Sequence, residues 1–590
     1  MLPRRESTAV EHVPDPPSSR LDHPRSLRHG LPDRQRRRPG ACLGRVPLYR
    51  RARGRPLGLG AAGARCGCER GRAVQTPPVQ AGRTARARST LATRLTLRNP
   101  AEFRGATAAL AVVLACALIW SLVPAVLLSA PHGDNVEQLN WSHGLQWGYL
   151  KHPPLPTWLL RAAIDVFGPS AALTYALAMA CVAAALLLLW LCAREVMEPR
   201  RALIALLVST ANYYLMGRGS FLNHNTVMLP FVALSAWAVL RIVKGGGGAM
   251  WLVLGLAQAL GLLTKYQMGL CVIANAAALL SAGVHRQPRF WPHLALAAAA
   301  TLLPLVPHAL WLVDHQFSTF EYAGHSLLAG LGPLQRFKSG VGFVGQQLAR
   351  LAPALLVLAL AAGIDAVWRP AVARSAKAGA RSAKAQALAV LALTPMAGIV
   401  LLILIAGVAP QNHWGSSATL LIPLLLVSRL PLAANRSVVA VAVATALCHA
   451  GAIAWNVAVW KIDPGPHHRF AARSLAALAQ RHWLQHQSGP IRLVVGPDWE
   501  AGSIALYLPG HPAVLPNADP RQAPWVDPEL ISRCGALVIG RTGQPLERQL
   551  SPSEAANATD QTVLEARDWL GRESAIQAAL IAPTRAAACD

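Results

Sequence analysis

The chain has 590 residues, of which 53% are hydrophobic and only 14% are charged. Ordinary globular proteins carry about 25% charged residues, so this composition excludes a mainly soluble or mainly disordered chain and indicates many membrane spans. The formal net charge is +28. Residues 1–100 hold 22 Arg, no Lys and 6 acidic residues, against 34 basic and 22 acidic residues in the rest of the chain. A nucleic-acid-binding function would therefore depend on the first hundred residues alone, and no nucleic-acid partner is expected.

Residues 1–100 form an Arg- and Pro-rich leader without an apolar run long enough to cross a bilayer. A segment of this composition cannot bury enough apolar surface to fold alone, so we expect it to be disordered. Two explanations stay open. Either translation starts downstream, shortly before the first span, or the leader is an arginine-rich arm for anionic lipid or nucleic acid. The complete absence of Lys among so many Arg favours the mis-assigned start.

Residues 101–460 contain eleven apolar runs that predict a polytopic α-helical membrane domain of about 11–13 transmembrane helices. A span needs about 20 predominantly apolar residues, somewhat fewer where neighbouring helices compensate. The runs are 106–128, 170–192, 202–216, 225–240, 249–264, 267–284, 290–312, 351–367, 386–408, 418–430 and 437–460.

The distribution of Lys and Arg between these runs predicts their sidedness. The loops at 193–201, 241–248, 285–289, 368–384 and 428–436 carry 14 Lys and Arg in 48 residues. The opposite loops, at 129–169, 217–224, 265–266, 313–350 and 409–417, carry 7 in 98 residues. Basic residues mark the cytoplasmic side, so the second set of loops and the tail after residue 460 are expected outside. In a Gram-negative cell this would be an inner-membrane protein with a periplasmic tail.

The tail, residues 461–590, predicts a small α/β domain. Residues 491–495 and 536–539 resemble short buried strands, and residues 470–485 and 499–507 resemble helices. No G-x-G-x-x-G, P-loop or nucleophile elbow occurs in this sequence. Cys534 and Cys589 are a candidate disulfide if the tail lies in an oxidising compartment, although spacing alone does not predict their pairing.

The unusual polar clusters all fall in the loops expected outside. Acidic, basic, amide and aromatic groups converging on one face predict a site at the outer membrane–water interface. Lys265 is the most informative residue, because a cation wedged between two apolar runs is costly unless an anion pairs with it. The other residues have plainer alternatives, as solvated carboxylates, interfacial cations or ordinary loop histidines. The candidates are Asp134, Glu137, Lys151, His152, Arg218, Asn223, His224, Lys265, Tyr266, Arg350, Asn412 and His413.

The run from Asp134 to Leu155 resembles the first periplasmic loop of bacterial family 39 glycosyltransferases. That loop typically reads D-E-A-Y-Y-W-x-W-S followed by W-G-Y-x-D-H-P-P-L, and it aligns here without a gap. The sequence Gly261-Leu-Leu-Thr-Lys-Tyr266 resembles the family's G-L-S-K-Y, and Asn412-His-Trp414 resembles its N-W-P-A. Members include protein O-mannosyltransferases, lipid A aminoarabinose transferases and lipopolysaccharide-core galacturonosyltransferases. The resemblance covers roughly residues 105–460.

Three positions depart from the family pattern. Asn135 stands where the family has the Glu of its Asp-Glu pair, and Lys151 stands where many members have Asp. The aminoarabinose transferases also tend to have Lys at this second position. The family's T-P-D-A motif is replaced by residues 223–226, Asn-His-Asn-Thr, which lack its Asp. These changes affect the expected substrate and metal binding more than the expected class of reaction.

The resemblance implies a GT-C type membrane enzyme that moves a sugar from a polyprenyl-phosphate-linked donor to an envelope acceptor on the periplasmic face, with inversion. The acceptor would be lipid A, core glycan, another lipid or a protein. Asp134 would be the general base, with Glu137 as the alternative. Lys265 would be the first phosphate ligand, ahead of Lys151, Arg218 and Arg350. The remaining candidates would bind substrate.

No metal and no cofactor are expected to be required, and a divalent metal is left open as an alternative. The rival function is a lipid or sugar transporter or flippase without transferase activity. Such a protein would be expected to place its ionisable groups near the bilayer midplane on broken helices. Here the ionisable groups lie near the outer ends of the apolar runs, which favours the enzyme.

Overall fold

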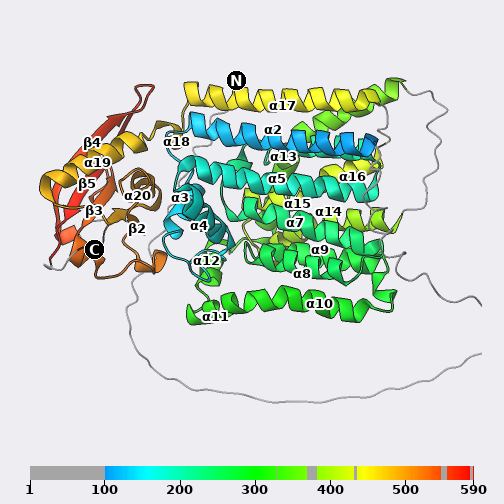
Figure 1. The fold of residues 1–590 in the computed structure, drawn as a ribbon, viewed down its shortest axis with the longest axis horizontal. Helices are drawn as coiled ribbons and strands as arrows, with labels where there is room; N and C mark the ends of the chain where they lie inside the picture. Colours follow the sequence, from blue (N-terminus) through cyan, green and yellow to red (C-terminus); the bar gives the residue numbers. More distant parts are fainter. Residues whose placement is uncertain are drawn as a thin grey trace, which may run out of the picture. The chain divides into compact units, whose positions relative to one another are not determined.

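The chain folds into a bundle of long helices followed by a small sheet domain (Figure 1). The structure, a computed structural model, describes residues 100–327, 330–368, 382–430, 435–546, 550, 555–584 and 589. The predicted disordered leader therefore lies almost wholly outside the described residues. The helices of the bundle and its loops are α2 (Pro100–Leu127), α3 (Gly133–Trp141), α4 (Leu155–Phe167), α5 (Ala171–Val196), α6 (Pro199–Thr210), α7 (His224–Val243), α8 (Gly248–Leu262), α9 (Met268–Ser281), α10 (Phe290–Leu302), α11 (Val306–Asp314), α12 (Ser318–Leu327), α13 (Pro333–Trp368), α14 (Ala383–Ala406), α15 (Gly415–Ala418), α16 (Ile422–Arg429) and α17 (Asn435–Ile462).

Each of the eleven apolar runs coincides with a helix or with two consecutive helices, so the predicted class of polytopic helical membrane protein is confirmed. Within the described residues, seven helical segments are long and apolar enough to cross a membrane. Two further apolar helices, α8 and α9, are shorter. The seven segments are Gly105–Leu127, Ala171–Val196, His224–Val243, Phe290–Asp314, Pro333–Gly363, Ala383–Ala406 and Ser437–Ile462.

Two of the predicted runs contain shorter helices than expected, and one predicted loop is helical. The run 202–216 ends its helix at Thr210, because Asn212 turns the chain by accepting a hydrogen bond from the backbone N–H of Tyr214 at 3.0 Å. The run 418–430 is split into α15 and α16, with Pro423 in the first turn of α16. Helix α13 begins at Pro333, so the outer loop expected at 313–350 is largely helical.

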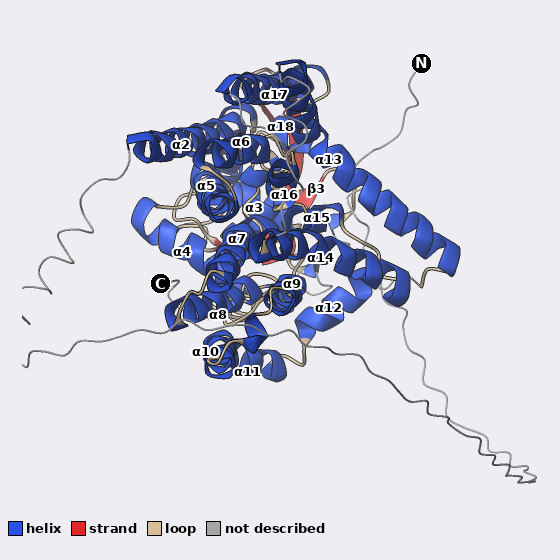
Figure 2. Cartoon of the chain, turned by 90° about the vertical axis from the view of Figure 1, so that its right-hand side faces the viewer, coloured by secondary structure: helices blue, strands red, loops and turns tan. Residues whose placement is uncertain are grey.

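The core of the bundle is apolar and lies mainly between α2, α5, α6, α7 and α14. Figure 2, seen along the helices, shows α5 and α7 inside the bundle, with α2, α10, α13 and α17 around the outside. The outer helices keep many large apolar side chains exposed, for example Leu114 and Leu118 on α2 and Val439 and Leu447 on α17. In a membrane this exposed surface faces lipid, so the bundle needs no polar outer face.

The tail forms a five-stranded sheet with the strand order β2-β1-β3-β5-β4. Strands β2, β1 and β3 are parallel, whereas β5 runs antiparallel to both β3 and β4. Both predicted strands are present as β1 and β3, and the α/β class of the tail is confirmed. The elements are α18 (Pro466–Arg469), α19 (Ala472–His486), β1 (Leu493–Gly496), α20 (Asp498–Ala505), β2 (Ala513–Pro516), α21 (Leu530–Cys534), β3 (Ala536–Arg541), β4 (Ala558–Arg567) and β5 (Glu573–Ile581).

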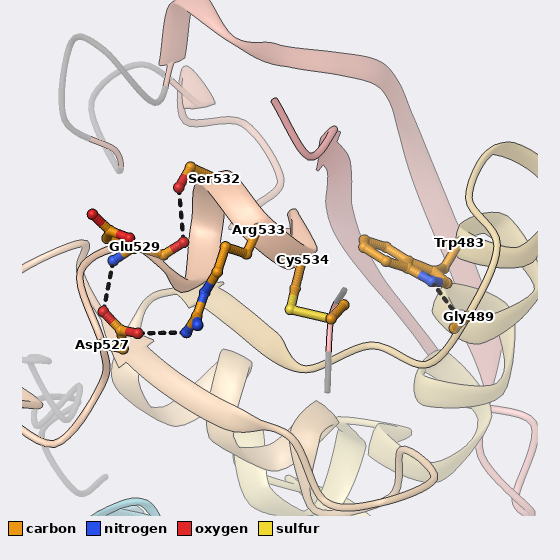
Figure 3. The surroundings of a disulfide bond; sticks show 8 residues. Trp483, Gly489, Asp527, Glu529, Ser532, Arg533 and Cys534 are labelled. Atoms are coloured by element: carbon orange, nitrogen blue, oxygen red, sulfur yellow. Dashed lines mark hydrogen bonds and ion pairs between the residues drawn. A yellow bond between two sulfur atoms is a disulfide. The ribbon is translucent and has the colours of Figure 1, made fainter. Parts of the chain in front are cut away.

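A disulfide joins α21 to the end of the chain. Cys534 and Cys589 are bonded to each other, with their Cα atoms 5.1 Å apart (Figure 3). Beside it, Arg533 forms an ion pair with Asp527, whose other carboxylate oxygen accepts a hydrogen bond from the backbone N–H of Glu529 at 2.9 Å. Disulfides persist in oxidising compartments, so this bond favours an oxidising compartment for the tail.

Candidate functional site

The four polar clusters seen in the sequence come together at the end of the helix bundle that lies beside the sheet domain. Figure 1 shows α3, α4 and α12 at the same end of the bundle as the sheet domain. Hydrogen bonds link the first loop to residue 223, residue 225 to residue 265, and residue 267 to residue 414. The four clusters therefore form one continuous site.

Asp134 lies in the first turn of α3, and its side chain is exposed. A carboxylate at this position is favoured by the partial positive charge of the helix N-terminus. Asn223 Nδ2 donates a hydrogen bond to Asp134 Oδ2 at 2.7 Å. The second carboxylate oxygen is left for other partners, which is the arrangement that a general base requires.

Asn223 is oriented by the helix that it caps. Its Oδ1 accepts hydrogen bonds from the backbone N–H groups of Asn225 and Thr226, each at 3.0 Å, at the start of α7. Because the oxygen of the amide is used in this N-cap, the NH2 group points at Asp134. The Asn that replaces the first residue of the family's T-P-D-A motif thus fixes the orientation of the candidate base.

Lys265 lies in the short turn between α8 and α9. Its Nζ donates to Asn225 Oδ1 at 2.8 Å and lies 5.9 Å from the centre of the Trp414 ring. Burial lowers the pKa of Lys265 to about 7, against the opposing attraction of Asp134. A partly buried ammonium whose hydrogen-bond partner is a neutral amide gains strongly from an incoming anion.

Glu137 and Lys151 form an ion pair next to Asp134 on the same loop. Lys151 Nζ and Glu137 Oε1 are 2.5 Å apart, and both side chains are largely buried. Burial raises the pKa of Glu137 to about 7 against the attraction of Lys151, while the Glu137 carboxylate raises the pKa of Lys151. This pairing makes Glu137 a less available base than Asp134 and Lys151 a less available phosphate ligand than Lys265.

Arg218, Arg350 and Asn412 lie on the other side of the site. Arg350 is on α13, where its guanidinium donates to the backbone carbonyl of Asn412. Arg218 is exposed and lies 5.4 Å from the Phe221 ring. His413, which is next to Asn412, has its pKa lowered to about 3 by burial and by the positive charges of Lys265, Arg350 and Arg218. The positive charges of three side chains, Lys265, Arg350 and Arg218, therefore all act on His413.

The remaining candidates are two histidines and a tyrosine. The rings of His152 and His224 lie against each other, with centroids 4.0 Å apart. Nε2 of His224 is buried without a hydrogen-bond partner among the described residues. The Tyr266 hydroxyl bonds to His308 Nε2 at 2.9 Å and to Thr319 Oγ1 at 3.1 Å, so Tyr266 joins the turn between α8 and α9 to α11 and α12.

An apolar cavity of about 730 Å³ adjoins the site. Its walls come from α2, α13, α17 and the turn before α7, and they include Trp120, Leu127 and Leu356. Its polar lining includes Arg218, His132 and His468. An apolar cavity that carries a cation suits an amphiphile with an anionic headgroup.

Several residues of the site could not be selected from the sequence. Asn225 holds Lys265, but an Asn in a loop is usually a turn residue and gives no sign of this contact. His308 Nδ1 donates a hydrogen bond to the carbonyl oxygen of Trp147 at 2.6 Å, although His308 lies within a predicted span. Asp498 contacts α3 from 358 positions away and carries no local signal. Among the described residues, no group of three or more His, Cys, Asp or Glu side chains is arranged to hold a metal ion.

Comparison with known proteins identifies the class. Residues 151–311 match the family described as dolichyl-phosphate-mannose-protein mannosyltransferase. The lipopolysaccharide core galacturonosyltransferase RgtA of Rhizobium johnstonii is 25% identical over 424 residues, which cover 69% of this chain and 82% of RgtA. RgtB of the same organism is 25% identical over 70% of this chain and 83% of its own length.

A solved structure shows the same fold. The crystal structure of ArnT from Cupriavidus metallidurans bound to undecaprenyl phosphate superimposes with a TM-score of 0.54 and 13% sequence identity. The match covers 79% of this chain and 97% of ArnT. The chain thus has the GT-C type of multi-pass membrane fold, and its sequence relatives RgtA and RgtB are transferases. More particularly, it is a glycosyltransferase similar to family 39, as its first loop predicts, and the rival function of a transporter without transferase activity is not supported by these relatives.

Proposed function

We propose that this enzyme transfers a sugar from a polyprenyl-phosphate-linked donor to a lipopolysaccharide acceptor, at the periplasmic face of the inner membrane. The observation that carries the proposal is that Asp134 and Lys265 lie in one hydrogen-bonded site, and that Arg218 of the same site lines an apolar cavity. RgtA and RgtB are named for the lipopolysaccharide core and RgtD for lipid A, which supports an acceptor of this class. Their common sugar, galacturonic acid, is the first sugar to test.

The donor would place its polyprenyl tail in the 730 Å³ cavity and its phosphate among the cations. Arg218 lines that cavity, so it ranks with Lys265 as a phosphate ligand. Arg350 supports them from α13, and Lys151 ranks last because Glu137 already neutralises it. The bound ligand of ArnT, undecaprenyl phosphate, is an amphiphile of this kind.

In the transfer step an acceptor hydroxyl attacks the anomeric carbon from the side opposite the phosphate. The new C–O bond forms as the bond between that carbon and the phosphate oxygen breaks. Asp134 takes the hydroxyl proton, and the phosphate leaves with the electron pair as an anion stabilised by Lys265 and Arg218. A glycosidase needs a carboxylic acid to protonate its leaving group, whereas a phosphate needs cations. One carboxylate therefore suffices, and the family's missing Glu at Asn135 is not required.

The periplasmic location is supported by two independent features. Basic residues concentrate about fourfold in the loops at the opposite end of the bundle. The Cys534–Cys589 disulfide requires an oxidising compartment on the side of the sheet domain.

The test is a deletion of the gene followed by mass spectrometry of lipid A and core oligosaccharide. We expect the loss of one sugar residue, with the mass of a hexuronic acid if the sugar is galacturonic acid, and its return on complementation with the wild-type gene. Purified protein should then transfer that sugar from a polyprenyl-phosphate donor. Unchanged glycolipids together with an altered glycoprotein would redirect the proposal to a protein acceptor, and no transfer at all would refute it.

A further inference from the structure

The short helix that carries Asp134 is held by the sheet domain. Helix α3 has nine residues, and a helix of this length is marginal without tertiary contacts. On one side the bundle holds it: Asn135 Nδ2 donates to Thr174 Oγ1 at 2.8 Å, and Gln138 Oε1 accepts from Thr157 Oγ1 at 2.8 Å. The opposite side of α3 packs on α20 of the tail.

The contact between α3 and α20 is close and specific. Asn140 Nδ2 donates to Asp498 Oδ1 at 2.7 Å. One turn further along α20, Gly502 lies so near to α3 that a Cβ atom there would stand 2.4 Å from Val136 Cγ1 and 2.6 Å from the Asn140 amide. Val136 is completely buried by this packing. Only glycine allows this approach of the two helices.

The segment that leads into α3 is also tied to the tail. The backbone N–H groups of Ser129 and Ala130 donate to the carbonyl of His467 at 3.0 and 3.1 Å. Trp499 Nε1 donates to the carbonyl of Pro131 at 2.8 Å. These bonds fix the chain within a few residues of Asp134, and Asp498 lies close enough to the Glu137–Lys151 pair to act on the charge of both.

We infer that α20 of the sheet domain is a positioning element for the candidate base, with Asp498 and Gly502 as positioning residues that set the place of α3 between the two domains. This inference rests on the proposed role of Asp134. It assigns the tail a part in catalysis without requiring it to recognise a ligand. A small misplacement of a catalytic group lowers the rate steeply, which is why so many bonds converge on so short a helix.

The test uses Asp498→Ala, Gly502→Val and a swap that exchanges the partners, Asn140→Asp with Asp498→Asn. Sugar transfer in complemented cells should fall ~10- to 100-fold in the first two variants. In the purified protein, hydrogen exchange of residues 133–141 should become faster. The swap rebuilds a hydrogen bond between the same two positions and should restore both readouts to near wild type. Asp527→Ala, which breaks an ion pair elsewhere in the sheet domain, is the matched control and should change neither.

The outcomes separate this inference from the proposed function. Unchanged exchange of α3 in Asp498→Ala and Gly502→Val would overturn the positioning role, whatever the activity. Faster exchange with full transfer would also overturn it. If Asp134→Asn is fully active while the α20 variants are slow and the swap rescues them, the positioning role stands and the choice of base is wrong. If the single variants do not fold, the swap variant alone decides, because its failure to support transfer would refute the pairing.

A second, independent feature is the hairpin between β4 and β5. Its turn is rigid, since Asp568 Oδ1 accepts hydrogen bonds from the backbone N–H groups of Leu570 and Arg572, each at 2.9 Å. At its tip Trp569 is 67% exposed and Leu570 is 43% exposed. An exposed Trp next to an exposed Leu on a fixed turn is unusual for a surface that faces water only.

This hairpin is fastened to the outer end of the spanning helix α17. Arg572 donates to the carbonyls of Trp460 and His468 at 2.9 and 2.8 Å. The Trp460 and Trp569 rings lie 5.2 Å apart. Ile462, the last residue of α17, is 83% exposed. The apolar tip is thereby continuous with the lipid-facing surface of α17, at the level where a bilayer favours Trp.

We propose that Trp569 and Leu570 insert into the lipid headgroup region and anchor the sheet domain to the membrane surface. The test places a fluorophore on Leu570→Cys in phosphatidylcholine nanodiscs that contain spin-labelled lipid. The control is Gln561→Cys, an exposed position on β4 roughly 20 Å from the end of the strand at which the turn begins. We expect strong quenching by the spin-labelled lipid at position 570 and weak quenching at position 561. Equal quenching at both positions, or easier access of aqueous iodide to position 570, would overturn the proposal.

Discussion

The basic side chains at the two ends of the helix bundle have different kinds of partner. At the end with the basic loops, the Glu195 carboxylate lies 3.1 Å from Arg241, 3.8 Å from Lys244 and 3.1 Å from Lys384. Three cations from two other helices and a loop thus share one carboxylate of α5. At the opposite end Lys151 is paired with the Glu137 carboxylate, but Lys265 and Arg350 donate to neutral oxygens of Asn225 and Asn412.

This difference distinguishes cations that stabilise the fold from cations that are available to bind a ligand. Cations gathered on a carboxylate hold α5, α7 and α14 together and have little left to offer a ligand. Cations whose hydrogen bonds go to amide oxygens keep their charge uncompensated, and an anion entering among them gains charge-assisted hydrogen bonds. The proposed donor phosphate would therefore bind at the end beside the sheet domain, the proposed outer end, and not at the end with the basic loops, the proposed inner end.

The largest expected effect is the loss of the base at the outer end. Asp134→Asn keeps the shape and the bond from Asn223 but cannot take a proton, so transfer should fall ~10²- to 10⁴-fold. The amount of sugar-modified glycolipid in complemented deletion cells measures it, with Glu137→Gln as the control. Near-full transfer by Asp134→Asn with an inactive Glu137→Gln would reverse the assignment.

Removal of an outer cation should weaken donor binding. Lys265→Ala loses one charged hydrogen bond to phosphate, which is worth roughly 1.5–3 kcal/mol, or about 10- to 100-fold in affinity. Binding of undecaprenyl phosphate to the purified protein measures this, with expression as the check on folding. Wild-type affinity in Lys265→Ala would refute the role of Lys265 in phosphate binding.

The same residue predicts a dependence on pH. The pKa of Lys265 is lowered to about 7 in the folded protein, so the ammonium is present below this pH and is lost above it. Donor affinity should therefore fall as the pH rises through about 7. In Lys265→Arg the charge persists at all these values, because Arg does not deprotonate in proteins. The phosphate of the donor also titrates, but it does so equally with both proteins. Comparing donor affinity against pH in the wild type and in Lys265→Arg therefore isolates the titration of Lys265. If the two affinity curves are parallel, the prediction is contradicted.

At the inner end the expected effect is on stability alone. Glu195→Gln leaves three neighbouring cations without their carboxylate, but they are partly exposed, so the cost should be about 1 kcal/mol. A lower melting temperature of the purified protein with unchanged affinity for undecaprenyl phosphate would agree. A loss of donor affinity equal to that of Lys265→Ala would remove the distinction between the two ends.

Single cysteine substitutions, which should perturb the protein least, test which end of the bundle faces the periplasm and which faces the cytoplasm. Single cysteines at Ser382, at the start of α14, and at Ser318, at the start of α12, should leave activity unchanged. An impermeant thiol reagent should label position 318 in intact cells and position 382 only after the inner membrane is opened. Labelling of position 382 in intact cells would invert the topology.

The sequence by itself determined the helical membrane class, the two ends of the bundle and the place of the polar clusters. These are local properties: apolar length decides what can span a bilayer, and the excess of basic residues decides which loops stay inside. The first loop likewise shows its resemblance within some twenty consecutive residues, and Lys265 stands out by its apolar flanks, so both candidate residues, Asp134 and Lys265, follow from local sequence alone.

The tertiary structure decided how these residues are used. The sequence does not reveal that Asn223 turns its amide to Asp134, that Lys151 pairs with Glu137, or that Arg350 lies on a helix instead of a loop. Nor does it reveal that Asp498 meets Asn140, because a hydrogen bond between groups 358 positions apart depends on the packing of two domains. Hydrogen bonds act over about 3 Å, and only the folded chain sets which groups come within that distance.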